Sequence, residues 1–224
     1  MTNVAILIPC YNEELTVGMV IREFKKINSS FRIYVYDNMS TDRTVDVAKH
    51  NNAVVRIVLS RGKGYVVQSM FRDIDAECYI LIDGDFTYSI ESVNTMIELI
   101  LDGKADMVIG SRLFNNSRLL SLLSSKILHA TFKLLFKKSI EDPLSGFRAF
   151  SKEFVKSFPA TSKGFEVETE MNLHAISKGY RIEYVPTVYI DRPIGSESKL
   201  KFIYDGSAII LKILKGFYKH IKCG

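Results

Sequence analysis

Short apolar runs alternate with stretches of helical periodicity along the first 110 residues of this 224-residue chain. The runs are rich in β-branched and aromatic residues, as buried strands are. This alternation is typical of an α/β protein, in which helices cover a mainly parallel sheet. The sequence predicts strands at Val4–Pro9, Arg32–Asp37, Val54–Ser60, Tyr79–Asp83 and Asp106–Gly110. It predicts helices between them at Glu14–Ile27, Thr41–His50, Tyr65–Asp73 and Ser89–Leu101.

The second half of the chain is both basic and apolar. Leu119–Phe136 repeats Leu, Ile and Phe at helical spacing, and residues 112–138 hold six basic residues and no acidic one. This stretch fits either a core helix with a solvated basic stripe or an amphipathic helix at a membrane surface. A helix at Glu166–Ser177 and a strand at Arg181–Val188 are expected next. Phe202–Ile221 again combines apolar residues with lysines at helix-like spacing.

The formal net charge of +5 comes entirely from the end of the chain, where residues 199–224 hold six lysines and one acidic residue. A basic segment on a neutral body indicates an anionic partner, with a membrane as the first candidate and nucleic acid as the second. The lysines alternate with Ile, Leu and Phe rather than with stacking aromatic residues. We therefore expect an anionic membrane surface and no nucleic acid as a partner.

Composition excludes several classes of protein. The chain is 47% hydrophobic and 25% charged with only 5 Pro, which is ordinary globular composition. No window of 18 residues is free of charge, so no transmembrane helix is expected, and Met1–Pro9 lacks the features of a secretion signal. Cys10, Cys78 and Cys223 are scattered, which fits reduced thiols and no zinc site. We expect a cytoplasmic protein, peripheral on the inner face of the membrane.

Polar segments follow the first two predicted strands. Ligands of open α/β sheets bind beyond the carboxyl ends of the strands, so chemistry is expected at these places. Pro9–Glu13 follows the first strand and opens a helix. Asp37–Asp42 follows the second strand, where a carboxylate can accept hydrogen bonds from a base or a ribose. Each segment also fits a plain turn with a helix cap.

The sharpest of these segments is Asp83-Gly84-Asp85, which follows a buried strand. It places two carboxylates on the rim of the sheet, and the glycine between them lets the backbone turn tightly. A hard divalent ion such as Mg²⁺ or Mn²⁺ takes carboxylate oxygens together with substrate phosphates. The sequence therefore predicts a metal site formed by Asp83 and Asp85.

The order and spacing of these segments resemble glycosyltransferase family 2. The chain is most similar to the branch that contains dolichol-phosphate mannosyltransferase and bacterial polyprenyl-phosphate glucosyltransferases. This resemblance implies a GT-A fold, with a single Rossmann-like, mostly parallel mixed sheet, flanking helices and a C-terminal amphipathic helix. The further segments that carry it are Gly110–Arg112, Asp142–Arg148, Arg192 and Gly195–Lys199.

The resemblance also implies a division of labour along the chain. Residues 1–110 would bind the nucleotide sugar and residues 111–200 the acceptor, together forming a catalytic domain of residues 1–200 before a basic helix at 201–224. The donor would be a UDP- or GDP-sugar, with Mg²⁺ or Mn²⁺ held chiefly by Asp85. Asn38 replaces a second aspartate of many relatives, and Lys63 fits a solvated turn as well as a phosphate contact. The expected donor-binding residues are Pro9, Tyr11, Glu13, Asp37, Lys63, Asp83 and Asp85.

The expected acceptor is a polyprenyl phosphate. A phosphate monoester is already largely anionic at neutral pH, so it needs cations and positioning more than a general base. Direct in-line attack would invert the anomeric centre. Arg112 and Arg148 are expected to act in catalysis together with Asp85. The expected acceptor-binding residues are Arg112, Ser145, Arg148, Glu168, Arg192 and Lys199.

Other functions remain open at this point. A saccharide or lipid-linked glycan could accept the sugar through a hydroxyl group, which would require a general base. Leu81–Thr87 also fits the motif of haloacid-dehalogenase-like phosphatases, in which the first aspartate is the nucleophile. A third alternative is a membrane-bound scaffold with a decayed transferase site. The sugar and the oligomeric state are not specified by the sequence.

Overall fold

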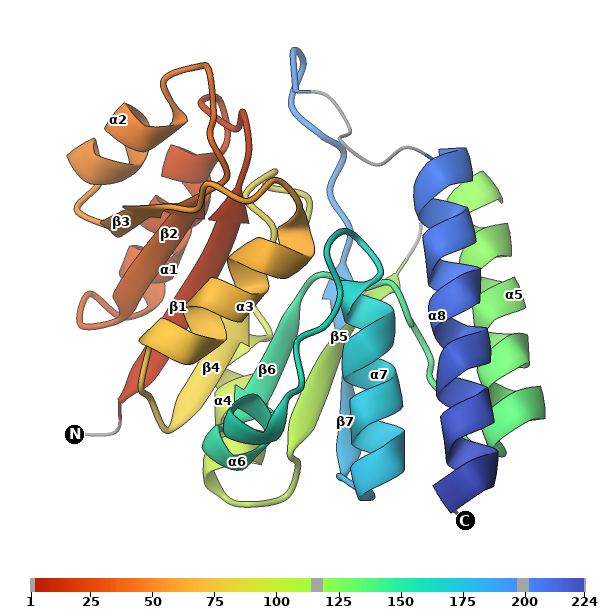
Figure 1. Cartoon of the computed structure of the whole chain (residues 1–224). Helices are drawn as coiled ribbons and strands as arrows, with labels where there is room; N and C mark the ends of the chain where they lie inside the picture. Colours follow the sequence, from red (N-terminus) through yellow and green to blue (C-terminus); the bar gives the residue numbers. More distant parts are fainter. Residues whose placement is uncertain (1–2, 114–118, 197–201, 224) are drawn as a thin grey trace.

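A computed structural model describes residues 3–113, 119–196 and 202–223 of the chain (Figure 1). The strands are β1 (Val4–Cys10), β2 (Arg32–Asp37), β3 (Val54–Ile57), β4 (Cys78–Leu81), β5 (Met107–Leu113), β6 (Arg148–Ser151) and β7 (Ile182–Val188). The helices are α1 (Val17–Ile27), α2 (Thr44–His50), α3 (Lys63–Asp73), α4 (Val93–Leu101), α5 (Leu119–Phe136), α6 (Lys152–Ser157), α7 (Val167–Lys178) and α8 (Phe202–Cys223). The predicted α/β class is thereby confirmed.

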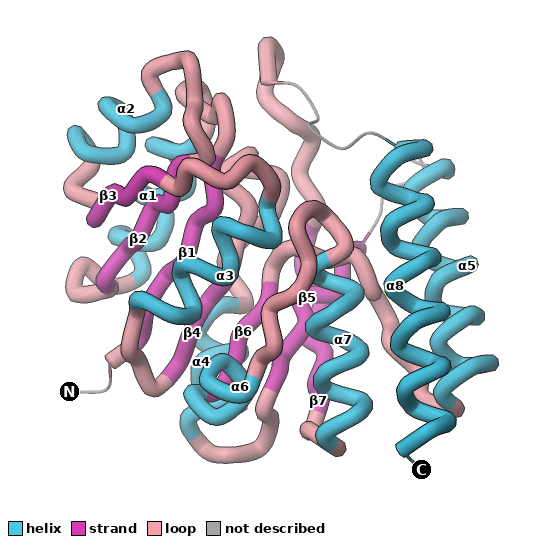
Figure 2. Tube along the Cα trace, in the orientation of Figure 1, coloured by secondary structure: helices cyan, strands magenta, loops and turns pink. Residues whose placement is uncertain are grey.

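The described strands form one seven-stranded sheet in the order β3-β2-β1-β4-β6-β5-β7. Strands β1 to β4 pair in parallel, and so do β5 and β7. Strand β6 is antiparallel to both of its neighbours and joins the two parallel parts of the sheet. The loops that follow β1, β2 and β3 gather at one edge of the sheet (Figure 2).

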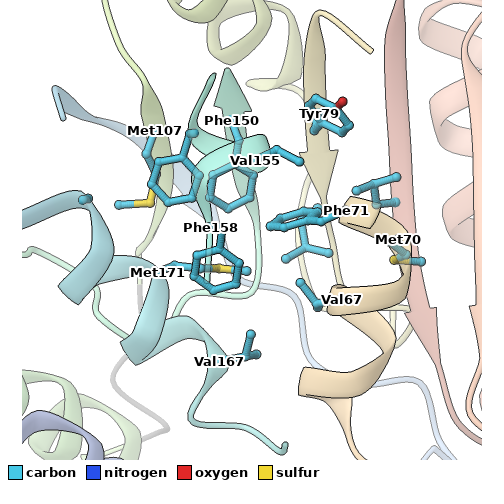
Figure 3. Close-up of a cluster of buried hydrophobic side chains, with 14 of the residues drawn as sticks. Val67, Met70, Phe71, Tyr79, Met107, Phe150, Val155, Phe158, Val167 and Met171 are labelled. Atoms are coloured by element: carbon cyan, nitrogen blue, oxygen red, sulfur yellow. The ribbon is translucent and has the colours of Figure 1, made fainter. Parts of the chain in front are cut away.

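Each face of the sheet carries its own hydrophobic core. Successive side chains of a strand point to opposite faces, so the fully apolar strand β1 serves both. Ala5 and Leu7 pack with residues of α3, α6 and α7, while Ile6 and Ile8 pack with residues of α1, α2 and α4. Figure 3 shows the first core, where Phe71, Phe150 and Phe158 lie among aliphatic and methionine side chains.

Helices α5 and α8 lie side by side beyond one end of the sheet (Figure 1). The Phe136 ring of α5 meets Phe217 of α8 edge to face, with the ring centroids 5.7 Å apart. Lys212 of α8 donates hydrogen bonds of 2.8 Å to the Thr161 hydroxyl and to the Glu170 carboxylate. Helix α8 therefore packs on the remainder of the fold, and the division at residue 200 stays a prediction about function.

Two elements were not foreseen from the sequence, β6 and α6. Strand β6 has four residues, begins with a charged residue and pairs with strands that are distant in sequence. Periodicity cannot reveal so short an inserted strand. The predicted strand at Val54–Ser60 was too long, because β3 ends at Ile57, and β4 ends at Leu81 rather than at Asp83. Asp83 therefore lies in the loop beyond the sheet.

His174 of α7 lies in a cluster of aromatic side chains that borders the core shown in Figure 3. Its ring contacts those of Phe154, Phe158 and Tyr180, and its Nε2 lies 3.0 Å from the Ser157 hydroxyl. Burial first, and then the positive charge of Lys178, lower the pKa of His174, while Glu170 opposes the shift. The folded protein therefore favours the neutral ring.

A histidine whose pKa is lowered by folding destabilises the protein in acid. We expect the free energy of unfolding to fall below about pH 6.5, because the unfolded chain takes up a proton that the buried ring resists. The contribution is limited to about 1.4 kcal/mol per pH unit for one proton. Urea denaturation should show a smaller loss in His174→Phe than in the wild type. The exposed His50, replaced in the same way, is the control, and equal slopes in the wild type and His174→Phe would contradict the assignment.

Candidate functional site

The loops that follow β1 and β2 are joined into one unit by hydrogen bonds. Asn38 N donates to the Cys10 carbonyl over 2.8 Å, and Asn12 N donates to the Ser40 hydroxyl over the same distance. Glu13 N likewise donates to Thr44 Oγ1 at the start of α2. The two polar segments singled out in the sequence therefore lie together at the carboxyl edge of the sheet.

Most of the predicted donor residues in these loops are buried. Asp37 accepts hydrogen bonds from the backbone and hydroxyl of Ser40, so it holds the turn and does not present its carboxylate to solvent. Glu13 accepts a hydrogen bond from Thr16, and Pro9 is enclosed in β1. Contact of Asp37, Glu13 and Pro9 with the donor stays a prediction, and their burial gives all three a structural part.

Tyr11 remains partly exposed, and Arg61 lies over it. The Arg61 guanidinium carbon is 3.8 Å from the centroid of the Tyr11 ring, a cation–π contact. The guanidinium also donates hydrogen bonds to the carbonyls of Asn38 and Met39. Sequence reasoning missed Arg61, although its place between β3 and the glycine that precedes α3 was a usable signal. The pair presents a flat surface of the kind on which a base can stack.

Asp83 and Asp85 lie beyond β4, in close contact with two other loops. A β-carbon on Gly84 would approach Cys10 Sγ to 2.7 Å, and one on Gly146 would approach Asp83 Oδ2 to 2.2 Å. A larger residue at either position would therefore displace the side chain it meets. The backbone at Gly146 is itself fixed, because its N–H donates to the Tyr88 hydroxyl over 2.9 Å. Asp83 is thus set against the loop between α5 and β6.

Asp85 is the more deeply buried of the two carboxylates. It accepts hydrogen bonds from the backbone and hydroxyl of Thr87 and forms an ion pair with Arg192. Burial first, and then the negative charge of Asp83, raise the pKa of Asp85, while Arg192 opposes the shift. Burial and a neighbouring negative charge thus disfavour the ionised form of Asp85, and a cation placed beside it would stabilise that form.

Lys63 is largely buried between two carboxylates. Its Nζ is 2.5 Å from Asp83 Oδ1 and 2.5 Å from Glu168 Oε1. Burial alone would lower the pKa of Lys63, but the two carboxylates raise it well above its ordinary value. The alternative of a solvated turn is therefore wrong. Glu168, expected at the acceptor, lies in this bridge and is only 3% exposed.

Arg112 and Asp142 form a bidentate ion pair. Nε and Nη2 of Arg112 donate to the two oxygens of Asp142, each over 2.7 Å, and the guanidinium lies 5.5 Å from the centroid of Tyr189. Burial alone would lower the pKa of Arg112, but Tyr88 and Asp142 raise it. Asp142 was part of a recognised motif without an assigned role. It anchors Arg112.

The structure corrects the roles expected of Arg148 and Ser145. Both side chains are fully buried. The Arg148 guanidinium donates to the carbonyls of Ser145 and Pro143 and to the Asn172 side chain, and the Ser145 hydroxyl donates to the Gly110 carbonyl. With its donors engaged inside the protein, Arg148 supports the loop that precedes β6 and does not face an acceptor. Lys199 lies outside the described residues.

The protein ligands available to a metal ion are few. Among the described residues, no group of three or more His, Cys, Asp or Glu side chains could hold one. Asp83 and Asp85 offer two carboxylates, which fit Mg²⁺ or Mn²⁺, since such ions complete their coordination with substrate phosphates and water. The pair does not resemble a structural zinc site, since such sites are closed tetrahedra of cysteine and histidine ligands.

Comparisons with known proteins identify the family of the chain. The family model described as glycosyl transferase family 2 matches residues 5–158. Glycosyltransferase AglJ of Haloferax volcanii is 34% identical over 218 residues, which cover 95% of this chain and 71% of that protein. A dolichyl-phosphate hexose transferase of the same organism is 27% identical over 216 residues, which cover 95% of this chain and 93% of that protein.

The fold has counterparts among solved structures. One is glucosyl-3-phosphoglycerate synthase from Mycobacterium tuberculosis in complex with Mn²⁺, UDP and glucosyl-3-phosphoglycerate, with a TM-score of 0.73 and 21% identity. The match covers 96% of this chain and 80% of that one. It confirms the predicted GT-A fold. The family model and the similarity to glycosyltransferase AglJ show that the chain belongs to glycosyltransferase family 2 and is a glycosyltransferase.

Proposed function

We propose that the enzyme transfers a hexose from a UDP- or GDP-linked sugar to a polyprenyl phosphate, with inversion of the anomeric centre and with Mg²⁺ or Mn²⁺. The observation that carries the proposal is the placement of Asp83 and Asp85. They lie where Cys10, the last residue of β1, approaches Gly84 and where Arg192 reaches Asp85. Carboxylates for a metal and an arginine for a phosphate are thus in contact at one point.

The donor would occupy the edge formed by the loops after β1 and β2. Tyr11 and Arg61 offer a stacking surface for the base, and Asp85, with Asp83, would hold the divalent cation. When bound, that cation would neutralise the charge that develops on the leaving diphosphate. The neighbouring structure of glucosyl-3-phosphoglycerate synthase, which contains Mn²⁺ and UDP, supports this type of donor.

The acceptor would be held by cations. Arg192 is partly exposed beside Asp85, and Arg112 is oriented by Asp142, so both are suited to grip a phosphate. Lys199 remains a candidate in the same role. Arg148 and Ser145 contribute by fixing the loop that carries Asp142. The dolichyl-phosphate hexose transferase among the relatives supports a lipid phosphate as the acceptor.

The alternative with a hydroxyl acceptor is less well supported by the geometry. It requires a carboxylate that is free to take a proton at the reacting centre. Glu168, which is expected at the acceptor, is buried and paired with Lys63, so it is not free for this role. Membership of glycosyltransferase family 2 also leaves no place for the phosphatase alternative, in which Asp83 would be the nucleophile.

Transfer assays would test the proposed reaction. Purified protein with Mg²⁺ or Mn²⁺ should transfer sugar from at least one member of a panel of UDP- and GDP-sugars to a short polyprenyl phosphate. The stereochemistry of the product, read by NMR, should be inverted. Transfer to free sugars or glycans, with none to any polyprenyl phosphate, would favour the hydroxyl alternative instead.

Substitution of Asp85 tests the metal assignment. Asp85→Asn keeps an oxygen that can accept the hydrogen bonds of Thr87, so the fold should persist while the charge is lost. We expect the rate of transfer to fall by about 100-fold or more, because electrostatic stabilisation of the leaving group depends on that charge. Asp102→Asn, at an exposed position, is the matched control. Unchanged activity in Asp85→Asn would contradict the assignment.

We further propose that the enzyme docks on an anionic membrane surface through α8 and α5. Among the described residues, no helix is both long enough and apolar enough to cross a bilayer. Ile209 and Ile213 face the protein, whereas α8 exposes Ile210, Leu211, Leu214 and Tyr218 next to Lys215. Helix α5 exposes Leu134 beside Lys133. Apolar side chains flanked by lysines are typical of helices that lie in a lipid interface.

Vesicle binding would test this surface. The wild-type protein should bind vesicles that contain phosphatidylglycerol and should dissociate as salt is added. Leu211→Glu combined with Leu214→Glu should weaken binding by about tenfold or more, since apolar area leaves the interface and negative charge enters it. Leu59→Glu, at an exposed leucine just after β3, is the control. Equal binding by the wild type and the double variant would show that lipid contacts another surface.

A further inference from the structure

Lys63 connects two carboxylates that come from opposite halves of the chain. Asp83 follows β4, and Glu168 lies in the first turn of α7. The Lys63 side chain is 10% exposed, and that of Glu168 is 4% exposed. The Phe165 ring lies 5.8 Å from the ammonium group on another side. The ammonium group and Glu168 are thus shielded from water, whereas the Asp83 side chain is 28% exposed.

The backbone around Lys63 has little freedom to move. Gly62 has a φ of 130°, and a β-carbon there would approach the Lys163 carbonyl oxygen to 2.1 Å. A β-carbon on Gly64 would approach the Ser162 carbonyl oxygen to 2.2 Å. The N-terminus of α3 is therefore pressed against the segment that leads into α7. Any change in the Lys63 contacts must come from its flexible side chain.

Asp83 offers its oxygens to different neighbours. Oδ1 accepts the 2.5 Å hydrogen bond from Lys63, and Oδ2 faces the backbone of Gly146. A divalent cation at Asp83 would therefore approach a carboxylate that already holds a lysine. Two cations on one carboxylate repel each other, and the repulsion is screened less where one of them, the Lys63 ammonium, is largely buried. One of them must give way.

Glu168 provides the place to which Lys63 can withdraw. Its Oε1 is buried and, among the described residues, accepts no hydrogen bond of normal geometry, although the Lys63 ammonium lies next to it. A buried carboxylate oxygen without a well-formed hydrogen bond is stabilised when a donor turns fully toward it. Lys63 can make that turn without movement of the backbone, because both carboxylates are already within reach.

We propose that Lys63 is a built-in competitor of the divalent cation, which occupies Asp83 in the metal-free enzyme and transfers to Glu168 when the metal binds. The inference rests on the proposed metal site at Asp83 and Asp85. In consequence the metal ion binds weakly in the absence of nucleotide. The negative charge of the donor diphosphate is needed to offset the repulsion between the metal ion and Lys63. Lys63 and Glu168 are positioning residues, which act through Asp83.

Substitution of Lys63 and substitution of Glu168 should change the affinity for Mn²⁺ in opposite directions. Titration of the metal-free full chain with Mn²⁺, followed by the EPR signal of the free ion, gives the dissociation constant without nucleotide. Lys63→Met should tighten binding by about tenfold, because a positive charge leaves the site. Glu168→Gln should weaken binding severalfold, because Lys63 loses its second partner and stays on Asp83. Damage to the fold would instead weaken binding in both variants.

A double variant separates the proposed role from simple removal of charge. In Lys63→Met/Glu168→Gln no competitor remains, so Mn²⁺ should bind more tightly than to the wild type, and most of the Glu168→Gln effect should vanish. This variant also leaves no more unpaired carboxylates than the wild type has, which protects its folding. Lys152→Met and Glu183→Gln, at exposed positions at the opposite edge of the sheet, make the same changes of charge as controls.

Two results would overturn the inference. One is Mn²⁺ binding to Lys63→Met that is equal to or weaker than binding to the wild type. The other is a Glu168→Gln effect of the same size with and without Lys63. Failure of the proposed metal site has a different signature, namely that neither the wild type nor any variant binds Mn²⁺, even with UDP present. The two failures can therefore be told apart.

Discussion

The buried guanidinium of Arg148 is the interaction on which the rest of the site depends. It has no exposed surface, and the cost of removing its charge from water is offset by hydrogen bonds to Pro143, Ser145 and Asn172. Those bonds fix the loop between α5 and β6. The same loop carries Asp142, which holds Arg112, and Gly146, which lies against Asp83. Through this one side chain, α7 and the acceptor half are placed relative to the carboxylates of the donor half.

The site is organised as pairs of opposite charge that each link two elements. Arg112 pairs with Asp142, Arg192 with Asp85, and Lys63 with both Asp83 and Glu168. Each of these four carboxylates thus already has a cation beside it. An incoming substrate or metal ion must therefore replace one member of an existing ion pair. Such exchange favours ligands that bring both signs of charge together, as a diphosphate with a divalent cation does.

The sequence was informative where periodicity and strand ends decide the outcome. Alternating apolar runs predicted β1 and β2 closely, and the rule that ligands bind beyond strand ends led to Asp83 and Asp85. It was misleading for Arg148, because an arginine in a recognised motif was assumed to face a phosphate, whereas its place at the start of β6 turns it inward. The partners of Lys63 could not be predicted. They come from loops that are far apart along the chain and meet only once the sheet has formed.

The antiparallel strand β6 has a consequence for the order of synthesis. On the ribosome, β1 to β4 emerge together with the helices that cover them, and β2, β3 and β4 can each pair with a strand already made. Strand β5 then emerges with neither of its neighbours, because β6 and β7 are both encoded later. Until Arg148–Ser151 has left the exit tunnel, the edges of β4 and β5 are open to wrong partners. The leucine-rich segment between β5 and β6 is exposed during the same interval, which makes this stage the one at which a chaperone would be most useful to the nascent chain.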